Sequence, residues 1–352
     1  MVDIKSVSKQ LRAILSDKLS LYRSNPEAES ELKEVMLRAF QKNAWFTSMN
    51  IVAALEEWIF ALSDENVSHW LSLYHQSIPV KVSKRIGVIN AGNIPFVGMH
   101  DLLAVIFSGH NYIGKNASDD QHLLPWIARQ IISAEPAFEN KISFVERLEK
   151  MDAVIATGSD NSSRYFEYYF GKYPNVIRKN RNGIAILTGN ESNEELQLLG
   201  NDIFSYFGLG CRNVSKIYIP ADFKLDRLFE AVYDQNEVMN NQKYMNNFDY
   251  NNSVLLLKLV PFLQNGFLIM LENEKISSPI SILHYERYDN LQSLTNKLDE
   301  MKDQIQCIVC SEKTIGEEYA IKNIRVGFGQ SQKPKLWDYA DGVDTISFLS
   351  NV

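Results

Sequence analysis

The sequence predicts an α/β protein in which two parallel-sheet α/β domains follow a helical N-terminal region. Apolar residues before residue 80 recur at helical spacing, as do Leu32, Val35, Met36 and Ala39. From Arg85 onward, short apolar runs alternate with helix-like stretches. Strands that alternate with helices in this way favour parallel sheets with helices packed around them.

Periodicity and capping residues locate the individual elements. Thr47 and Ser63 stand where they can cap helices within the first 80 residues. In the first α/β stretch we expect strands at 86–91, 109–114 and 153–156, and helices at 98–108, 119–135 and 159–171. In the second we expect strands at 184–187, 216–219, 254–258, 267–271, 280–284 and 306–309, and helices at 194–207, 222–237 and 291–301. The residues from 327 onward look irregular and then extended.

Composition and charge exclude several classes of protein. The chain has 352 residues, of which 45% are hydrophobic and 22% charged, as in packed globular proteins and unlike disordered or low-complexity ones. The net charge of -7 supplies no basic field, so we expect no nucleic acid partner and no attraction to anionic lipid. The longest strongly apolar runs, such as Leu102–Phe107, are too short for a membrane span.

The cysteine count and the N-terminal sequence indicate a cytoplasmic setting. Cys211, Cys307 and Cys310 are too few, and odd in number, for a disulfide scaffold, which favours a reducing compartment. Residues 1–17 alternate charged and apolar side chains and lack the apolar core of a signal peptide. The six histidines show no metal-ligand spacing, so we expect no metal site.

Two short motifs are rejected as cofactor or redox sites. The segment GLGCRN at 208–213 begins like a dinucleotide fingerprint, but Asn213 stands where the third glycine belongs. The segment also follows an expected helix, whereas a dinucleotide loop opens one. Cys307 and Cys310 have redox spacing, but they lie in an expected buried strand, which favours a structural role.

Cys211 is the candidate nucleophile. It lies in a loop before an expected strand, where Gly208 and Gly210 permit unusual backbone angles and the close approach of a ligand. A structural cysteine is the alternative that the residues by themselves leave open. The neighbouring Arg212 can favour the thiolate form.

Three further segments carry polar groups at the ends of expected strands, where open α/β sheets bind ligands. Asn93 lies in a Gly-Asn-Ile-Pro turn directly after a strand, and Lys115 closes the next strand. Gly158 and Ser159 open a helix whose backbone amides can face a phosphate. Each segment also has a simpler interpretation, as a turn, an exposed lysine or a helix cap.

The order of these segments resembles the aldehyde dehydrogenase superfamily. The segments are GVINAGNIPFVGMHDLLAVIFSGHNYIGK at 87–115, ATGS at 156–159 and FGLGCRNVSKIYIP at 207–220. Asn93, Lys115, Gly158, Ser159 and Cys211 match the superfamily motifs residue by residue. The ending, GFGQSQKPKLWDYADGVDTISFL at 327–349, and the helical start resemble a narrower group, the luminescence-type acyl-CoA reductase (LuxC) family.

The resemblance implies an aldehyde dehydrogenase-like fold with four parts. These are a helical N-terminal region at 1–80, a dinucleotide-binding domain at 81–182, a catalytic domain at 183–326 and a C-terminal tail at 327–352 that returns to the body. It further implies that Cys211 is the nucleophile and that Asn93 donates to the oxyanion. Lys115, Gly158 and Ser159 would then contact the cofactor.

The implied reaction is the reduction of an acyl thioester, such as a fatty acyl-CoA, to an aldehyde. It proceeds through a covalent acyl-cysteine and takes hydride from NADPH, with NADH as the alternative. The resemblance also implies an acyl-CoA or acyl-protein thioester as donor, an acyltransferase or synthetase partner, and a homo-oligomer. Two alternative functions remain. The protein could be a reductase of short acyl-CoA or acyl-phosphate, or an inactive scaffold of this fold that binds an acyltransferase or synthetase.

Two departures from the superfamily pattern bear on the direction of the reaction. Oxidising members carry a glutamate that activates water, but the matching stretch here, Ile177–Arg181, has no carboxylate. A second superfamily glutamate holds the nicotinamide ribose, and the matching stretch here is Lys275–Pro279. The first loss suits a reductase, which needs no hydrolytic water. Glu191 and Glu272 are two other carboxylates that the fold could bring to the position of the missing water-activating glutamate.

Overall fold

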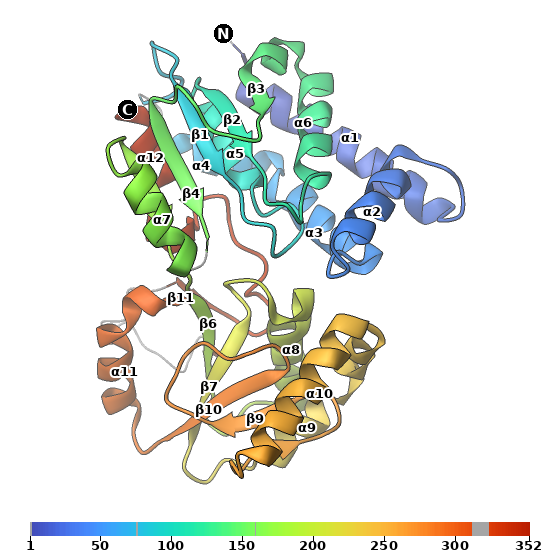
Figure 1. The fold of residues 1–352 in the computed structure, drawn as a ribbon, viewed down its shortest axis with the longest axis vertical. Helices are drawn as coiled ribbons and strands as arrows, with labels where there is room; N and C mark the ends of the chain where they lie inside the picture. Colours follow the sequence, from blue (N-terminus) through green and yellow to red (C-terminus); the bar gives the residue numbers. More distant parts are fainter. Residues whose placement is uncertain (1, 75–76, 159, 312–323) are drawn as a thin grey trace. The chain divides into compact units, whose positions relative to one another are not determined.

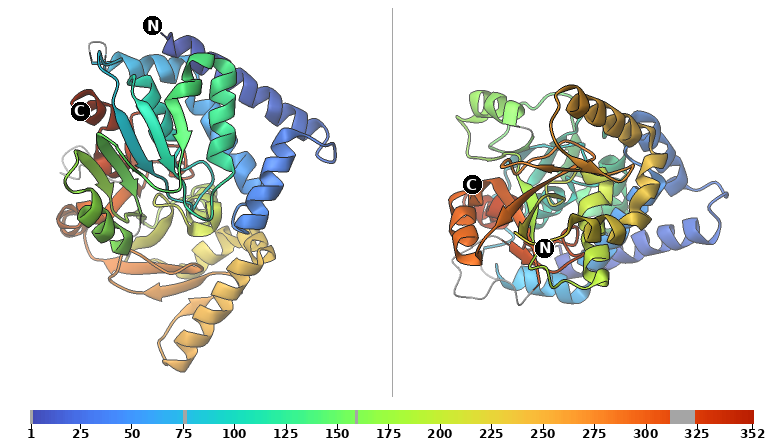
Figure 2. Two further views of the ribbon diagram at one scale, coloured as in Figure 1. Left: turned by 45° about the horizontal axis from the view of Figure 1, so that its top comes forward. Right: turned by 90° about the horizontal axis from the view of Figure 1, so that it is seen from below.

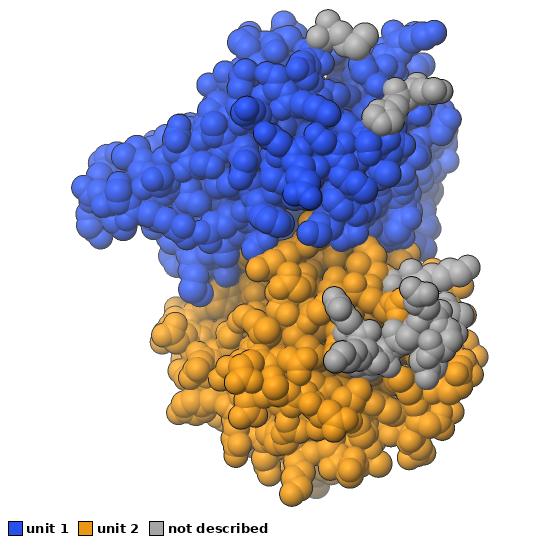
Figure 3. Space-filling model, turned by 180° about the vertical axis from the view of Figure 1, so that it is seen from behind, with its two compact units in different colours: residues 1–179, 335–352 blue, residues 180–334 orange. Residues whose placement is uncertain are grey.

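The computed structural model describes residues 2–74, 77–158, 160–311 and 324–352. The chain divides into two compact units, shown in blue and orange in Figure 3. Unit 1 comprises Met1–Lys179 and Lys335–Val352, and unit 2 comprises Asn180–Pro334. Each unit contains a mainly or wholly parallel sheet covered by helices, which confirms the predicted α/β fold class.

Unit 1 is built on a five-stranded parallel sheet in the order β3-β2-β1-β4-β5. Its strands are β1 (Arg85–Ile89), β2 (Asn111–Lys115), β3 (Ile142–Phe144), β4 (Ala153–Thr157) and β5 (Asn175–Arg178). The strand order reverses direction between β1 and β4. A reversal of this kind opens a crevice at the carboxyl ends of the two strands, where such sheets bind ligands.

The helices of unit 1 surround this sheet (Figure 1). They are α1 (Ile4–Ser24), α2 (Glu31–Lys42), α3 (Ser48–Ala61), α4 (Asp64–Ser72), α5 (Met99–Phe107), α6 (Leu123–Ala134), α7 (Asp160–Phe170) and α12 (Thr345–Ser350), with 3-10 turns at Pro136–Lys141 and Ala340–Gly342. The Thr47 side chain accepts from the Asn50 N–H and the Ser63 side chain from the Asn66 N–H, which confirms both predicted caps.

The end of the chain is helical, so the expectation of an extended tail is wrong. The Asp344 side chain caps α12 by accepting from the Ser347 N–H, and Ile346 and Leu349 are buried. Asp344 also accepts from the Tyr74 hydroxyl at 2.7 Å. The β-branched residues at the start of α12 favour a strand locally, but the cap and the burial against unit 1 outweigh that preference.

Unit 2 contains a seven-stranded sheet in the order β12-β11-β6-β7-β10-β9-β8. Its strands are β6 (Asn182–Ile186), β7 (Val214–Pro220), β8 (Leu263–Gln264), β9 (Ile269–Glu272), β10 (Ile282–Tyr288), β11 (Ile305–Val309) and β12 (Ile324–Val326). All neighbours pair in parallel except β8, which is antiparallel to β9.

Helices lie on both sides of the unit 2 sheet (Figure 1). They are α8 (Asn193–Phe204), α9 (Leu225–Ala231), α10 (Gln242–Leu257) and α11 (Leu291–Glu300), with 3-10 turns at Ser205–Gly208, Tyr233–Asn240 and Lys302–Gln304. Leu294 and Leu298 of α11 pack against Ile184 and Ile186 of β6. Among the described residues, no helix has both the length and the apolar character that crossing a membrane requires.

The predicted strand at 254–258 is wrong, because these residues form the last turn of α10 (gold in Figure 2). Leu255 and Phe248 of this helix pack against Ile269 and Leu271 of β9. Leu257, by contrast, is 84% exposed. A short run of branched apolar residues is compatible with either a strand or a helix. Here the helical conformation places one side of the run against the sheet and leaves the other side exposed.

Candidate active site

The carboxyl ends of β1, β2 and β4 meet at one edge of the unit 1 sheet. Ile89 at the end of β1 pairs with Lys115 of β2 and, on its other side, with Ala156 of β4. Lys115 is exposed at this edge, and Gly158 follows the end of β4. Ser159 lies outside the described residues. Lys115 and Gly158 therefore lie at the edge where the strand order reverses.

The turn that carries Asn93 packs closely against the loop after β2. A Cβ added to Gly92 would lie 2.8 Å from the Cβ of Ala117, so only glycine allows this approach. The Gly92 carbonyl accepts from the Asn43 side-chain amide at 3.3 Å, and the buried Phe96 adopts φ of 58°. Asn93 itself is exposed.

Asn90 is a residue of this edge that sequence reasoning missed. Its backbone N–H donates to the Lys115 carbonyl at 2.9 Å. Its side-chain amide nitrogen donates to the Tyr112 hydroxyl at 2.7 Å and to the Asn116 side chain at 2.9 Å. Asn90 thereby ties the end of β1 to the end of β2. A polar residue directly after the apolar run of β1 is the signal that could have found it.

Asp120 is a buried carboxyl in the loop after β2, 6% exposed. Burial raises the pKa of Asp120 to about 6, although the Leu123 N–H donates to its carboxylate at 3.3 Å. The folded state therefore holds this carboxyl in its neutral form at pH values where the unfolded chain has already ionised it. The burial of this carboxyl costs no stability below about pH 4, and it lowers the free energy of unfolding progressively as the pH rises to about 6.

Asp120→Asn should for this reason stabilise the protein at neutral pH. A pKa that rises from 3.8 to about 6 corresponds to about 3 kcal/mol, so the variant should gain up to that amount at pH 7.5 and much less at pH 4.5. Urea unfolding at both pH values measures the difference. Asp119→Asn, at the exposed neighbouring position, is the matched control. An equal difference at both pH values would contradict a raised pKa of Asp120.

Cys211 belongs to unit 2, in a loop with unusual backbone geometry. Tyr206, Phe207 and Gly208 have φ angles of 51°, 58° and 77°, so three consecutive residues occupy the left-handed region. Such strain persists only where the surroundings determine the backbone, as is common at functional sites. Cys211 follows at the amino end of β7 and is exposed to solvent.

Asn213 organises the loop around Cys211. Its side-chain oxygen accepts from the Gly210 N–H at 2.8 Å. Its side-chain nitrogen donates to the carbonyls of Asp202, Ile203 and Ser205 at 3.1, 3.3 and 2.8 Å. One buried side chain therefore joins the end of α8, the left-handed segment and the residue before Cys211. Asn213, the mismatch to the dinucleotide fingerprint, therefore determines the conformation of the loop.

Two further contacts hold the surroundings of the loop in place. A Cβ on Gly183 would lie 2.5 Å from the Arg212 carbonyl, so β6 approaches the loop as closely as glycine permits. The buried Asp202 carboxylate accepts from the N–H groups of Gly329 and Ser331 at 2.6 and 2.9 Å. Burial raises the pKa of Asp202, and these two donors oppose that shift. The segment after β12 is thereby anchored to α8.

The stretch Ile177–Arg181, which sequence analysis matched to the superfamily's water-activating glutamate, has a structural role at Arg178. Its guanidinium is 5% exposed and makes two hydrogen bonds to the Asp101 carboxylate, at 2.6 and 2.9 Å. A third bond, to the Thr345 hydroxyl at 2.9 Å, reaches α12. Arg178 is thus committed within unit 1, where it fastens the C-terminal helix.

Neither carboxylate that sequence analysis left open stands beside Cys211. Glu191 lies beyond the carboxyl end of β6, and its carboxylate accepts from the Thr188 and Gly189 N–H groups at 2.6 and 3.0 Å. Because β6 and β7 are parallel, Glu191 and Cys211 lie at opposite edges of the sheet, separated by the seven residues of β7, or about 20 Å. Glu272 ends β9, beside Tyr285 of β10.

Cys307 and Cys310 are buried at β11, in agreement with the structural role that the sequence predicts. Burial raises the pKa of Cys310 to about 11, so its thiol stays protonated at neutral pH. Within the described ranges, no group of three or more His, Cys, Asp or Glu side chains is arranged to hold a metal ion. Of the three cysteines, all in unit 2, Cys211 is the exposed one.

Solved structures with the same fold are aldehyde dehydrogenases and related enzymes. Aldehyde dehydrogenase 21 from Physcomitrella patens, in complex with the reaction product succinate, has a TM-score of 0.69 at 12% identity over 99% of this chain and 83% of that one. An NADP-dependent enzyme from E. coli has a TM-score of 0.66 at 12% identity, over 93% of this chain and 77% of that one. An acetylating aldehyde dehydrogenase from Geobacillus thermoglucosidasius has a TM-score of 0.63 at 10% identity, over 95% of this chain and 86% of that one.

These similarities establish the fold. No protein-family model matches the sequence, and no curated protein matches it significantly. The chain has the aldehyde dehydrogenase fold, which confirms the fold that the segments around Asn93 and Cys211 implied.

Proposed function

We propose that the protein reduces an acyl thioester, such as a fatty acyl-CoA, to an aldehyde, with Cys211 as the nucleophile. The observation that carries the proposal is the exposed Cys211 in a loop that the four hydrogen bonds of Asn213 preorganise. Two further points support a thioester substrate. An acetylating aldehyde dehydrogenase shares the fold, and Glu191, Glu272 and Arg178 supply no water-activating base near Cys211.

The chemistry follows from a thiolate at Cys211. Its sulfur attacks the thioester carbonyl and forms a new C–S bond, and the CoA sulfur leaves as a thiolate that takes a proton from solvent. A reduced nicotinamide nucleotide, held by the residues at the strand reversal of unit 1, would supply the hydride that converts the acyl-cysteine into a thiohemiacetal. Proton transfer and cleavage of the C–S bond then release the aldehyde and return the electron pair to the sulfur of Cys211.

We assign two hydrogen-bond donors to the oxyanion that forms on the acyl carbon. One is the backbone N–H of Cys211, and the other is the side-chain amide of Asn93, following the superfamily match. Each donor of this kind lowers the barrier by about 2.7–4 kcal/mol. Both lie on backbone held in place, by the bonds of Asn213 in unit 2 and by the close packing of Gly92 in unit 1.

The residues at the strand reversal of unit 1 fit a nicotinamide nucleotide. The exposed Lys115 ammonium suits an adenosine ribose or its 2'-phosphate. The start of α7 after Gly158 suits the pyrophosphate, and Ser159 is assigned there with it. We take NADPH as the cofactor and NADH as the alternative.

Lys115→Ala tests the cofactor assignment. The loss of a cation that pairs with the 2'-phosphate should weaken NADPH binding by about tenfold and NADH binding much less. Fluorescence titration of each reduced nucleotide measures both affinities. Equal weakening of the two would place Lys115 on the shared ribose and would remove the reason to prefer NADPH.

The direction of the reaction is tested by running it backwards. Because Glu191 and Glu272 lie away from Cys211, we expect no activated water at the acyl-Cys211 intermediate, which should persist and transfer only to hydride or to a thiol. Aldehyde with oxidised cofactor should therefore yield little free acid and should yield acyl-CoA once CoA is added. Chromatography of the products, with Cys211→Ala as the blank, makes the measurement. Steady release of free acid in the absence of CoA would show that a base exists and that the reductase function is wrong.

A further inference from the structure

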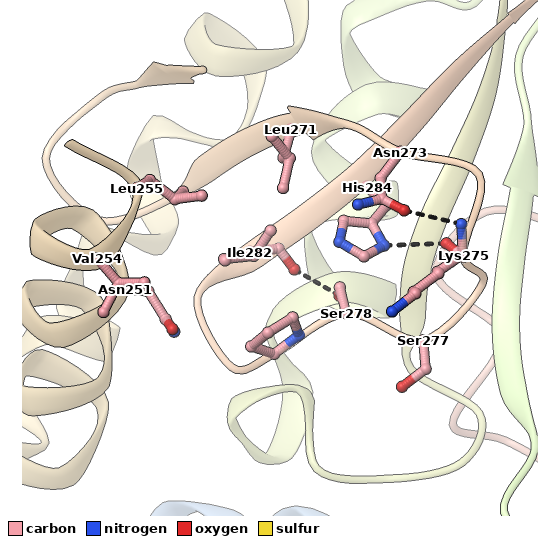
Figure 4. A pocket seen from close by; sticks show the side chains of 11 residues that line it. Asn251, Val254, Leu255, Leu271, Asn273, Lys275, Ser277, Ser278, Ile282 and His284 are labelled. Atoms are coloured by element: carbon pink, nitrogen blue, oxygen red, sulfur yellow. Dashed lines mark hydrogen bonds between the residues drawn. The ribbon is translucent and has the colours of Figure 1, made fainter. Parts of the chain in front are cut away.

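Unit 2 contains a cavity of about 590 Å³ between α10 and the crossover Asn273–Ser281 that joins β9 to β10 (Figure 4). This volume falls in the range of small-molecule sites. One wall is aliphatic and the other polar. The aliphatic wall consists of Val254, Leu255, Leu271, Pro279 and Ile282, and the polar wall of Asn251, Asn273, Lys275, Ser277, Ser278 and His284.

Three consecutive backbone carbonyls of the crossover form hydrogen bonds with side chains of the sheet. The Lys216 ammonium donates to the Glu274 carbonyl at 2.7 Å, and the Ser215 hydroxyl donates to the Ile276 carbonyl at 2.8 Å. Between them, Nδ1 of His284 bonds to the Lys275 carbonyl at 2.9 Å. Three side chains of β7 and β10 thereby fix the backbone at the polar wall, which preorganises it for a ligand.

His284 presents an acceptor to this cavity. Because its Nδ1 faces a carbonyl, that nitrogen carries the proton, and Nε2 is left with a lone pair. The side chain is 3% exposed, and burial lowers the pKa of His284, so the ring is neutral. Among the described residues, none bonds to Nε2, and Figure 4 shows this nitrogen on the side of the ring that faces Ile282. A ligand must therefore bring an N–H or O–H donor.

Lys275 supplies a charge to the polar wall of the cavity. Its side chain is exposed, makes no ion pair with a described residue, and turns toward Ser278 of the cavity wall in Figure 4. It stands at the start of the stretch matched to the superfamily glutamate that holds a ribose. A cation at this position favours an anionic group over ribose hydroxyls.

One end of the cavity, at Pro279 and Ile282, lies at the same edge of the sheet as Cys211. His284 pairs with Lys216, so β10 and β7 begin side by side. Pro279 accepts from the N–H of Ile282 at the start of β10, and Cys211 precedes the start of β7. A ligand in this cavity is thus held at the edge that carries the nucleophile.

We propose that this cavity binds the pantetheine arm of the acyl thioester, with Lys275 at its phosphate end. The arm has alkyl groups for the aliphatic wall, amide N–H and hydroxyl donors for His284, and a phosphate terminus for Lys275. A fatty acyl chain offers no donor to His284, and a nucleotide offers no aliphatic section to Leu255. This subsite rests on the proposed thioester function and names the part of the protein that recognises the donor.

Calorimetric titration of the full chain with two unreactive probes, S-methyl-CoA and S-methylpantetheine, tests the subsite. Val254→Trp fills the cavity and should weaken both probes by about tenfold or more, whereas Leu257→Trp, on the exposed side of the same helix, should change neither. Lys275→Ala should weaken S-methyl-CoA by about fivefold and leave S-methylpantetheine nearly unchanged, with Lys258→Ala as its control.

The outcomes separate this inference from the proposed function. If Val254→Trp binds both probes as the wild type does, or if dodecanoate binds the cavity and S-methylpantetheine does not, the subsite is wrong. An unchanged KM for acyl-CoA in Val254→Trp would also overturn the subsite while leaving the reductase function intact. Binding of both probes at the cavity by a protein that reduces no acyl thioester would support the subsite and refute the function. Because Lys275 is exposed, its variant remains informative even if Val254→Trp does not fold.

Discussion

Cys211→Ala is expected to lower the rate of acyl thioester reduction by more than about a thousandfold, because no covalent acyl-enzyme can form without the thiol. The variant should fold normally. Cys211 is exposed, and exposed substitutions change stability by about 0.5 kcal/mol or less. Cofactor affinity should also be unchanged, since the residues assigned to the cofactor lie in unit 1.

Mass spectrometry of the intact protein after incubation with acyl-CoA in the absence of cofactor measures the acyl adduct directly. The wild type should gain one acyl group on Cys211, and Cys211→Ala none. Cys310→Ser is the matched control, because it removes a buried thiol and should leave the adduct in place at some cost in stability. An adduct on Cys307, or one that survives in Cys211→Ala, would falsify the assignment of the nucleophile.

Asn213→Ala is expected to have the second largest effect, on both stability and activity. The side chain is 2% exposed and makes four hydrogen bonds, each contributing roughly 1 kcal/mol, so unit 2 should lose about 3 kcal/mol or more. The left-handed backbone at Tyr206 and Phe207 would also lose its restraint. The loop should then no longer hold Cys211 in one position.

Urea unfolding and the rate of Cys211 acylation together measure this effect. Asn213→Asp should be nearly as damaging, because a carboxylate accepts from Gly210 but cannot donate to three carbonyls. Asn236→Ala, which removes an exposed asparagine with a single bond to the Tyr233 carbonyl, should be nearly neutral. If Asn213→Ala acylated as fast as the wild type in a folded protein, the loop would not depend on this side chain for its reactive geometry.

Local sequence patterns predicted the part of the fold that depends on local chemistry. A few adjacent residues are enough to predict each of the caps at Thr47 and Ser63 and the approximate ends of β1, β2 and β4. The same patterns placed Asn93, Lys115 and Gly158 at or just after the ends of three strands, and the parallel pairing of those strands brings their ends to one edge. The order of these segments then pointed to the aldehyde dehydrogenase fold.

Two secondary-structure predictions were wrong where local preference was ambiguous or outweighed. The apolar run at 254–258 suits a strand or a buried helix equally, and the packing of Leu255 on β9 decides for the helix. At the C-terminus, the cap by Asp344 and the burial of Ile346 decide for α12. Both decisions depend on surfaces that the local sequence does not contain.

The sequence by itself determined the type of fold and the place of Cys211 in a glycine-bearing loop before a strand. Only the tertiary structure decided what holds that loop and what its neighbours do. In the sequence, Asn213 is a mismatch to the dinucleotide fingerprint. In the structure, its side chain holds the loop together by hydrogen bonds. Arg178 is one of several cations in the stretch Ile177–Arg181, and the structure pairs it with Asp101, 77 residues away in the chain. Capping and periodicity act over a few residues and can be read locally, whereas the partner of a buried polar group is set by which distant segments the fold brings within hydrogen-bond distance.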